Sequence, residues 1–156
     1  MFIDYSDEIV KEYSYKSLIK FAKHLKTKIG KRNVILLLAG NNIASLFAYV
    51  SCLLTKNVVI FISGDDIQSP LINKVLKMYH PNYIWCKDTF KEVFAHHEIL
   101  INAFGYVLLS KRKSINVMNE ELALLIPTSG STGISKMVKL SYQNLYSNTR
   151  DICQYL

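Results

Sequence analysis

The sequence lacks any apolar run long enough to cross a membrane. Its longest apolar stretch, residues 43–54, is interrupted by two serines, whereas a helix that crosses a bilayer needs about twenty predominantly apolar residues. The first residues carry acidic side chains where a secretory signal peptide would have basic residues followed by an apolar segment. We therefore expect no membrane span and no export, and we interpret the chain as cytoplasmic.

Cysteine and histidine are also scarce. The three cysteines, Cys52, Cys86 and Cys153, are odd in number and far apart in the chain, which argues against a disulfide framework. None of the four histidines has a cysteine or a carboxylate at a metal-ligand spacing. The sequence therefore predicts reduced thiols and no metal site.

Acidic residues are outnumbered by basic ones, twelve against nineteen, and the formal net charge is +7. The basic residues are spread along the chain, and no recognition-helix or RNA-binding signature accompanies them. A nucleic-acid-binding protein would show binding that depends steeply on salt. We instead predict a solvated basic surface, an affinity for phosphate-bearing ligands, and no nucleic-acid partner.

The chain does contain an alternation of strand and helix patterns. Apolar residues at three- and four-residue steps predict a helix over 14–28, begun by Ser14 and ended by Gly30. The continuous apolar runs at 34–38 and 58–62 are typical of strands that are buried on both faces.

Between these strands the pattern predicts a helix over 43–54, capped by Asn41 or Asn42. Asn57 is expected to take the left-handed conformation after that helix. The later elements are expected to be a helix over 70–79 begun by Ser69 and Pro70, a strand over 82–86, a helix over 89–97, and strands over 106–109 and 122–126.

This order of elements predicts an α/β fold, with a layered, largely parallel sheet flanked by helices. We divide the chain into βα units over 1–109, a polar linker over 110–121, a strand–loop–strand unit over 122–140 and a helix over 141–156.

The segment PTSGSTGISK, residues 127–136, follows the last of these strands and precedes the extended run MVKL. Two glycines, Gly130 and Gly133, allow positive φ, so successive backbone N–H groups can face one anion. Hydroxyl donors that match phosphate oxygens, and one mobile positive charge, complete the segment: Thr128, Ser129, Ser131, Thr132 and Lys136. These residue types predict a loop that binds a polyphosphate.

The spacing excludes several better-known loops. The segment lacks the Gly-Lys-Ser/Thr of kinase-type P-loops, the third glycine of a dinucleotide-binding turn and the Gly-x-Ser-x-Gly of a hydrolase elbow. The alternative that remains from composition alone is a polar hairpin loop between two strands.

The stretch TSGSTGISK resembles the phosphate-loop signature of adenylate-forming (AMP-binding) enzymes, the superfamily of acyl-CoA synthetases, aryl-acid ligases, luciferases and peptide-synthetase adenylation domains. The stretches YSYKSLIKFAKHL, VILLLAGNNIASLFAYVSCLL, YHPNYIWC and LSYQNLYSN are similar to other elements of the family and lie where the family has them. Ser135 stands where the family usually has proline, which frees φ and restores an N–H group. Tyr142 stands where many members have histidine.

The resemblance implies the N-terminal part of the large domain of an AMP-forming acid ligase. Such enzymes react a carboxylic acid with ATP and Mg²⁺ to give an acyl-adenylate, and most then transfer the acyl group to the thiol of coenzyme A or of carrier-protein pantetheine. Residues 128–136 would hold the β- and γ-phosphates, bound by Thr128, Ser129, Gly130, Ser131, Thr132, Gly133 and Lys136.

The family's adenine pocket, magnesium-binding glutamate, acyl pocket and C-terminal lysine all lie downstream of this loop. The resemblance therefore assigns no catalytic residue and no metal ligand here, and it implies an N-terminal fragment that is inactive alone and able to associate with itself through newly exposed surface. The alternative is a non-catalytic, stand-alone nucleotide- or phosphate-binding or interaction module that kept the fold.

Overall fold

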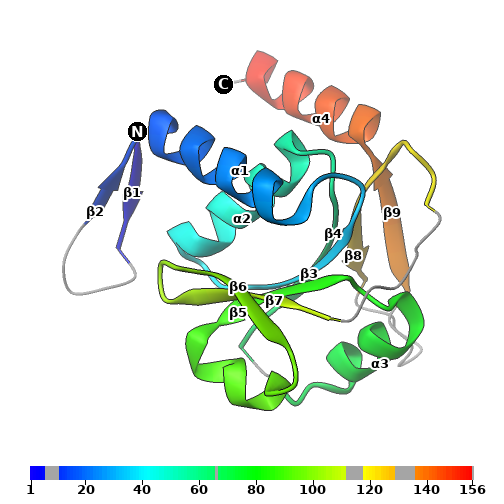
Figure 1. The fold of residues 1–156 in the computed structure, drawn as a ribbon. Coiled ribbons are helices and arrows are strands. Elements are labelled where there is room, and N and C mark those ends of the chain that lie inside the picture. Colours follow the sequence, from blue (N-terminus) through cyan, green and yellow to red (C-terminus); the bar gives the residue numbers. More distant parts are fainter. Residues whose placement is uncertain (6–10, 66, 112–117, 129–135, 156) are drawn as a thin grey trace.

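A seven-stranded sheet forms the centre of the molecule, with strands in the order β6-β7-β5-β3-β4-β8-β9 (Figure 1). The computed structural model describes residues 1–5, 11–65, 67–111, 118–128 and 136–155. The strands of this sheet are β3 (Val34–Ala39), β4 (Val58–Ser63), β5 (Tyr83–Lys87), β6 (Glu98–Ala103), β7 (Tyr106–Ser110), β8 (Leu122–Pro127) and β9 (Met137–Ser141).

The four central strands, β5, β3, β4 and β8, run parallel to one another, and both edges of the sheet are closed by antiparallel strands. The predicted α/β class, with its layered and largely parallel sheet, is confirmed. Strands β6 and β7 are joined by a tight turn. There Phe104 and Gly105 both have positive φ (57° and 72°), as a two-residue hairpin turn requires.

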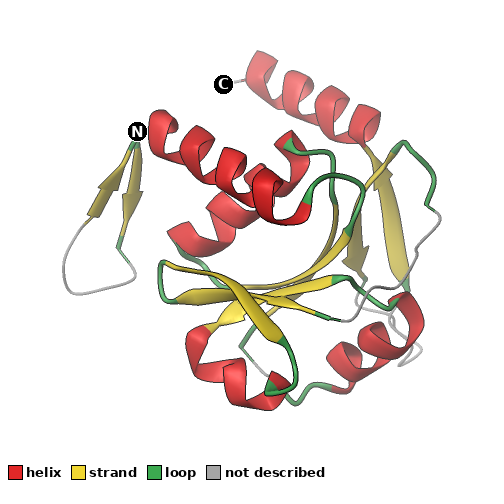
Figure 2. Cartoon of the chain, viewed as in Figure 1, coloured by secondary structure: helices red, strands yellow, loops and turns green. Residues whose placement is uncertain are grey.

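Helices cover both faces of the sheet (Figures 1 and 2). One face carries α1, α2 and α4, and the other carries α3 and the 3₁₀ helix η1. A small separate hairpin pairs the N-terminal strands β1 and β2. The bounds of these elements are α1 Tyr15–Ile29, α2 Ile43–Leu54, α3 Pro70–Tyr79, η1 Asp88–Phe94, α4 Tyr142–Tyr155, β1 Phe2–Asp4 and β2 Lys11–Tyr13.

The early elements form for the reasons that the sequence indicates. The Ser14 side chain accepts a hydrogen bond from the backbone N–H of Ser17, and Gly30 ends α1 with φ 72°. Asn42, one of the two candidates, caps α2. All six residues of β3 are buried, because α1 and α2 pack on one side of it and α3 on the other.

The prediction for Asn57 was wrong. The left-handed residue after α2 is Lys56, with φ 58°, and Asn57 is instead fully buried. Its side-chain oxygen accepts from the Asn33 backbone N–H at 2.8 Å, and its side-chain nitrogen donates to the Gly30 carbonyl at 3.1 Å. Asn57 therefore joins the starts of β3 and β4 rather than forming a turn.

Other expectations are corrected in detail. Ser69 precedes α3, with Pro70 in the first turn, but its side chain makes no capping hydrogen bond. The helix expected over 89–97 is the shorter 3₁₀ helix η1, and β1, β2 and β6 were not expected. Cys52 and Cys86 are buried free thiols and Cys153 is an exposed one. In the described part of the chain, no helix has the length and apolarity to cross a membrane.

Candidate functional site

The two ends of the predicted phosphate loop lie side by side at the end of β8. Pro127 of β8 pairs with Met137 of β9 in an antiparallel register. The next residue, Thr128, donates twice to the carbonyl oxygen of Lys136, from its backbone nitrogen at 2.8 Å and from its Oγ1 at 3.1 Å. This double contact fixes the base of the loop across eight residues of chain.

Of the seven predicted binding residues, the structure places Thr128 and Lys136, and it brings their backbones together. Both side chains are exposed. The others, Ser129, Gly130, Ser131, Thr132 and Gly133, lie outside the described residues, as does Ser135. Their roles remain predictions.

The loop base lies at the carboxyl edge of the parallel strands. β8 is parallel to β4, and β4 is parallel to β3, so the segments that follow all three strands leave the sheet at the same edge. In open α/β sheets, ligands bind in the crevice outside this edge. The loop base therefore lies where ligands commonly bind in this class of fold.

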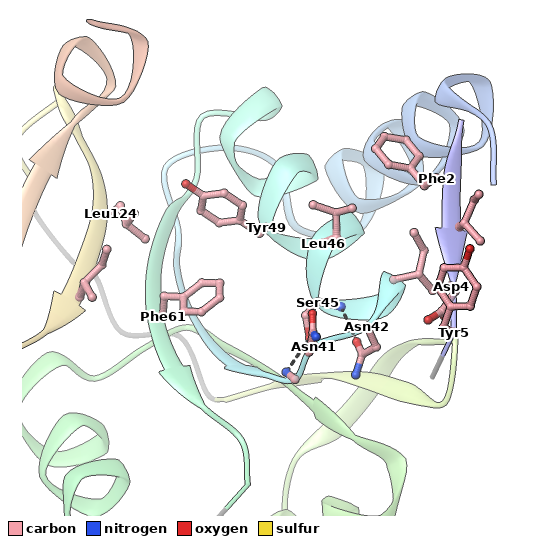
Figure 3. Close-up of a pocket in the computed structure, with 14 residues that line it drawn as sticks. Phe2, Asp4, Tyr5, Asn41, Asn42, Ser45, Leu46, Tyr49, Phe61 and Leu124 are labelled. Atoms are coloured by element: carbon pink, nitrogen blue, oxygen red, sulfur yellow. Dashed lines mark hydrogen bonds between the residues drawn. The ribbon is translucent and has the colours of Figure 1, made fainter. Parts of the chain in front are cut away.

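A pocket of about 720 Å³ opens at this same edge, between α2, β1 and the ends of β4 and β8 (Figure 3). Its lining is largely apolar. The rings of Tyr49 and Phe61 meet edge to face there, with centroids 5.7 Å apart, and burial raises the pKa of the Tyr49 hydroxyl. The remaining apolar lining comes from Phe2, Ile3, Ile43, Leu46, Leu124 and Ile126.

One end of the pocket is polar and held rigidly by the turn between β3 and α2. Asn42 accepts from the Ser45 backbone N–H at 3.0 Å and donates to the Tyr106 hydroxyl at 2.9 Å. The Ser45 hydroxyl in turn accepts from the Gly40 backbone N–H at 2.9 Å. A Cβ at Gly40 would lie 2.8 Å from the Asn42 amide nitrogen, so a larger residue there would have to displace the Asn42 side chain.

Sequence reasoning did not identify this pocket. Tyr49 lies in the predicted helix over 43–54 and Phe61 in the predicted strand over 58–62, and such a pattern cannot distinguish a core position from a pocket wall. The only available signal was the polar turn after a buried strand, which predicted the Asn42 cap but not its neighbours.

Tyr142 lies at the opposite edge of the sheet from the loop. Its hydroxyl donates to the Asn57 carbonyl at 3.0 Å, and the Lys56 ammonium lies 4.1 Å from the ring centroid. Burial is the main cause of its raised pKa, and the nearby Arg32 opposes the rise. These contacts make Tyr142 a packing residue that joins α4 to the start of β4.

The described residues contain no group of three or more His, Cys, Asp or Glu side chains that could hold a metal ion. Around the pocket and the loop base, the described groups offer hydrogen-bond donors, one lysine, the Asp4 carboxylate and apolar surface. This arrangement can bind a ligand.

No family model and no curated protein matches the chain. Solved structures do match it. Apo MatB from Rhodopseudomonas palustris superposes with a TM-score of 0.68 at 17% identity, over 93% of this chain and 32% of that one. A fatty acyl-adenylate ligase from L. pneumophila, in complex with acyl adenylate and pyrophosphate, superposes with a TM-score of 0.68 at 20% identity. The match covers 94% of this chain and 28% of the ligase. McyG A-PCP, complexed with phenylalanyl-adenylate, superposes with a TM-score of 0.64 at 22% identity. The match covers 95% of this chain and 27% of McyG A-PCP.

These neighbours are adenylate-forming enzymes, and the chain has the fold of their N-terminal portion. The chain spans about a third of the length of the structures that it matches. The likeness covers 93–95% of this chain.

Proposed function

We propose that the chain is the phosphate-binding portion of an AMP-forming acid ligase. In this reaction a carboxylate oxygen bonds to the α-phosphorus of ATP, and the bond to the β-phosphate breaks, giving an acyl-adenylate and pyrophosphate. A thiol, of coenzyme A or of carrier-protein pantetheine, would then take the acyl group and release AMP. A protein of this kind would act in the cytoplasm.

The observation that carries this proposal is the closed base of the loop at the end of a parallel strand. The two Thr128 hydrogen bonds to Lys136 hold the two ends of segment 128–136 together. We assign its N–H groups and hydroxyls, from Ser129, Gly130, Ser131, Thr132 and Gly133, to the β- and γ-phosphates. Lys136 would offset the charge of the leaving pyrophosphate.

The residues fit ATP but do not supply a magnesium site. Hydroxyls, backbone N–H groups and a lysine are donors that match phosphate oxygens. The described residues hold no carboxylate cluster for a metal ion, so we assign no Mg²⁺ ligand to them and derive no step through the ion.

A second candidate, an interaction module that kept the fold, rests on α4. None of the fourteen residues of this helix is buried, and three of its large side chains, Tyr146, Ile152 and Tyr155, are at least half exposed. Such a surface suits contact with a further domain or with a second copy of the chain. Measuring the molecular mass in solution distinguishes self-association from a monomer.

The proposed function is tested by binding and by turnover. Inorganic pyrophosphate, followed by its ³¹P resonance, is expected to bind the chain weakly, and Lys136→Ala is expected to weaken binding further. The 156-residue chain is expected to form no acyl-adenylate, because the family resemblance assigns no catalytic residue to this part of the enzyme. Carboxylate-dependent exchange of labelled pyrophosphate into ATP would contradict this expectation, and an unchanged affinity in Lys136→Ala would contradict the assigned loop.

A further inference from the structure

Helix α3 brings a second lysine to the cavity that Lys136 lines. Residues at three- and four-residue steps along α3, among them Lys74, face the start of β9, and Figure 1 shows the helix beside that end of the strand. Between them lies a cavity of about 260 Å³. It is lined by Leu71, Lys74, Val75, Met78, Tyr79, Lys136 and Met137.

Neither lysine is neutralised by another described residue. Lys91 pairs with Asp88 and Arg150 with Asp151, whereas neither Lys74 nor Lys136 makes an ion pair or a side-chain hydrogen bond with a described residue. Among the residues that the structure describes, no carboxylate lines their cavity. Two positive charges beside one cavity repel each other. An anion bound between them would attract both lysines and offset that repulsion.

The rest of the cavity wall suits the stems of the two lysines. Leu71, Val75, Met78 and Met137 are apolar, and lysine methylene groups pack along such surface while the ammonium group stays at the water interface. Because both side chains are exposed and line one cavity, a multiply charged anion there could contact both ammonium groups.

We propose that Lys74 is a second phosphate-contacting residue of this site, and that it binds the terminal phosphates of ATP and the released pyrophosphate together with Lys136. The proposal rests on the proposed function and extends it to α3, an element to which the loop motif assigns no role. Pyrophosphate is the suitable ligand class because it carries several charges across two phosphorus centres, so two lysines from different elements can contact it at once.

The test compares charge reversals at two lysines of the same helix. Lys74→Glu changes the proposed contact, whereas Lys77→Glu makes the same change in net charge on α3 at a side chain that does not line the cavity. Lys74→Arg keeps the charge, and Lys136→Ala reports on the loop. Each purified full chain is titrated with sodium pyrophosphate at low ionic strength and followed by ³¹P NMR.

We expect Lys74→Glu to weaken pyrophosphate binding about ten-fold, as expected for reversing one partly solvated charge contact. Lys77→Glu should weaken binding less than about two-fold, the long-range effect of net charge alone, and Lys74→Arg should stay within about two-fold of the parent chain. Because Lys74 is exposed, the thermal unfolding temperature should not change in any of the α3 variants, which excludes misfolding as the cause.

The outcomes separate the two proposals. Equal effects of Lys74→Glu and Lys77→Glu, with Lys136→Ala still impaired, would overturn the role of Lys74 and leave the loop assignment standing. A loss in Lys74→Glu together with an unchanged Lys136→Ala would support an anion site at α3 and contradict the assigned loop. No effect of any variant would overturn both.

Discussion

Replacing Asn57 with alanine is expected to destabilise the fold by about 3 kcal/mol. The side chain is 0% exposed and makes three hydrogen bonds below 3.2 Å. It accepts from the Asn33 backbone N–H at 2.8 Å and donates to the Gly30 carbonyl and the Thr55 hydroxyl at 3.1 and 2.9 Å. Each such bond contributes about 1 kcal/mol net, and a buried N–H group left without a partner costs about 1–3 kcal/mol.

The loss is large compared with the total stability of a domain, which is about 5–15 kcal/mol. It is measured by urea unfolding, with the single tryptophan, Trp85, as the fluorescence probe, because this residue is buried. Asn73→Ala is the matched control. Asn73 lies exposed on α3, so its replacement should change the free energy of unfolding by less than about 0.5 kcal/mol.

Asn57→Asp tests the donated hydrogen bonds separately from the accepted one. It keeps the acceptor for Asn33 but loses both donated bonds and buries a carboxylate, so it should be at least as damaging as alanine. A free energy of unfolding for Asn57→Ala within about 1 kcal/mol of the parent chain, with the same slope against urea concentration, would contradict this prediction.

Three further predictions follow from packing and burial. Gly64→Ala should destabilise the fold by about 1–3 kcal/mol in the same urea assay, because the added Cβ would lie 2.9 Å from the Leu38 carbonyl oxygen; unchanged stability would show that the backbone yields there. Burial raises the pKa of the Cys52 and Cys86 thiols to about 12, so a thiol reagent at pH 8 should label only Cys153 in the folded chain and all three cysteines in urea. Since the unfolded thiols ionise near pH 9 and the buried ones do not, unfolding releases protons, and stability should fall as the pH rises from about 9 towards 12, by up to about 1.4 kcal/mol per pH unit for each thiol. A flat stability over that range would contradict the burial of both thiols.

The sequence predicted those elements whose cause is local. α1 and α2 follow from apolar spacing and from caps at Ser14 and Asn42, and β3 and β4 from unbroken apolar runs. Of the β6–β7 hairpin, the sequence predicted β7 but not β6. The turn between them places Phe104 at positive φ, a conformation that phenylalanine rarely adopts and that composition does not indicate.

The role of Asn57 was missed for a different reason. Asparagine after a helix is typical of a left-handed turn residue, but here tertiary contacts decide. Its partners, Asn33 and Gly30, lie 24 and 27 residues earlier in the chain, and only the parallel pairing of β3 with β4 brings them together. Spacing within the sequence carries no information about such a contact.

In the candidate site, too, some features follow from local sequence and others depend on tertiary contacts. The motif indicates the loop from residue types alone, and the structure adds what depends on topology, namely the closed base at Thr128 and Lys136 and the apolar pocket at the same sheet edge. Lys74 is 62 positions from Lys136 in the sequence, and it becomes a candidate only because α3 packs beside the start of β9.

The central claim is that residues 128–136 form a polyphosphate-binding loop at the end of β8. The most direct measurement is an amide ¹H–¹⁵N NMR titration of the full chain with inorganic pyrophosphate. We predict that the largest chemical-shift changes fall on residues 128–136, with smaller ones at the start of β9. Saturable changes confined to other elements, or none in the loop at millimolar pyrophosphate, would contradict it.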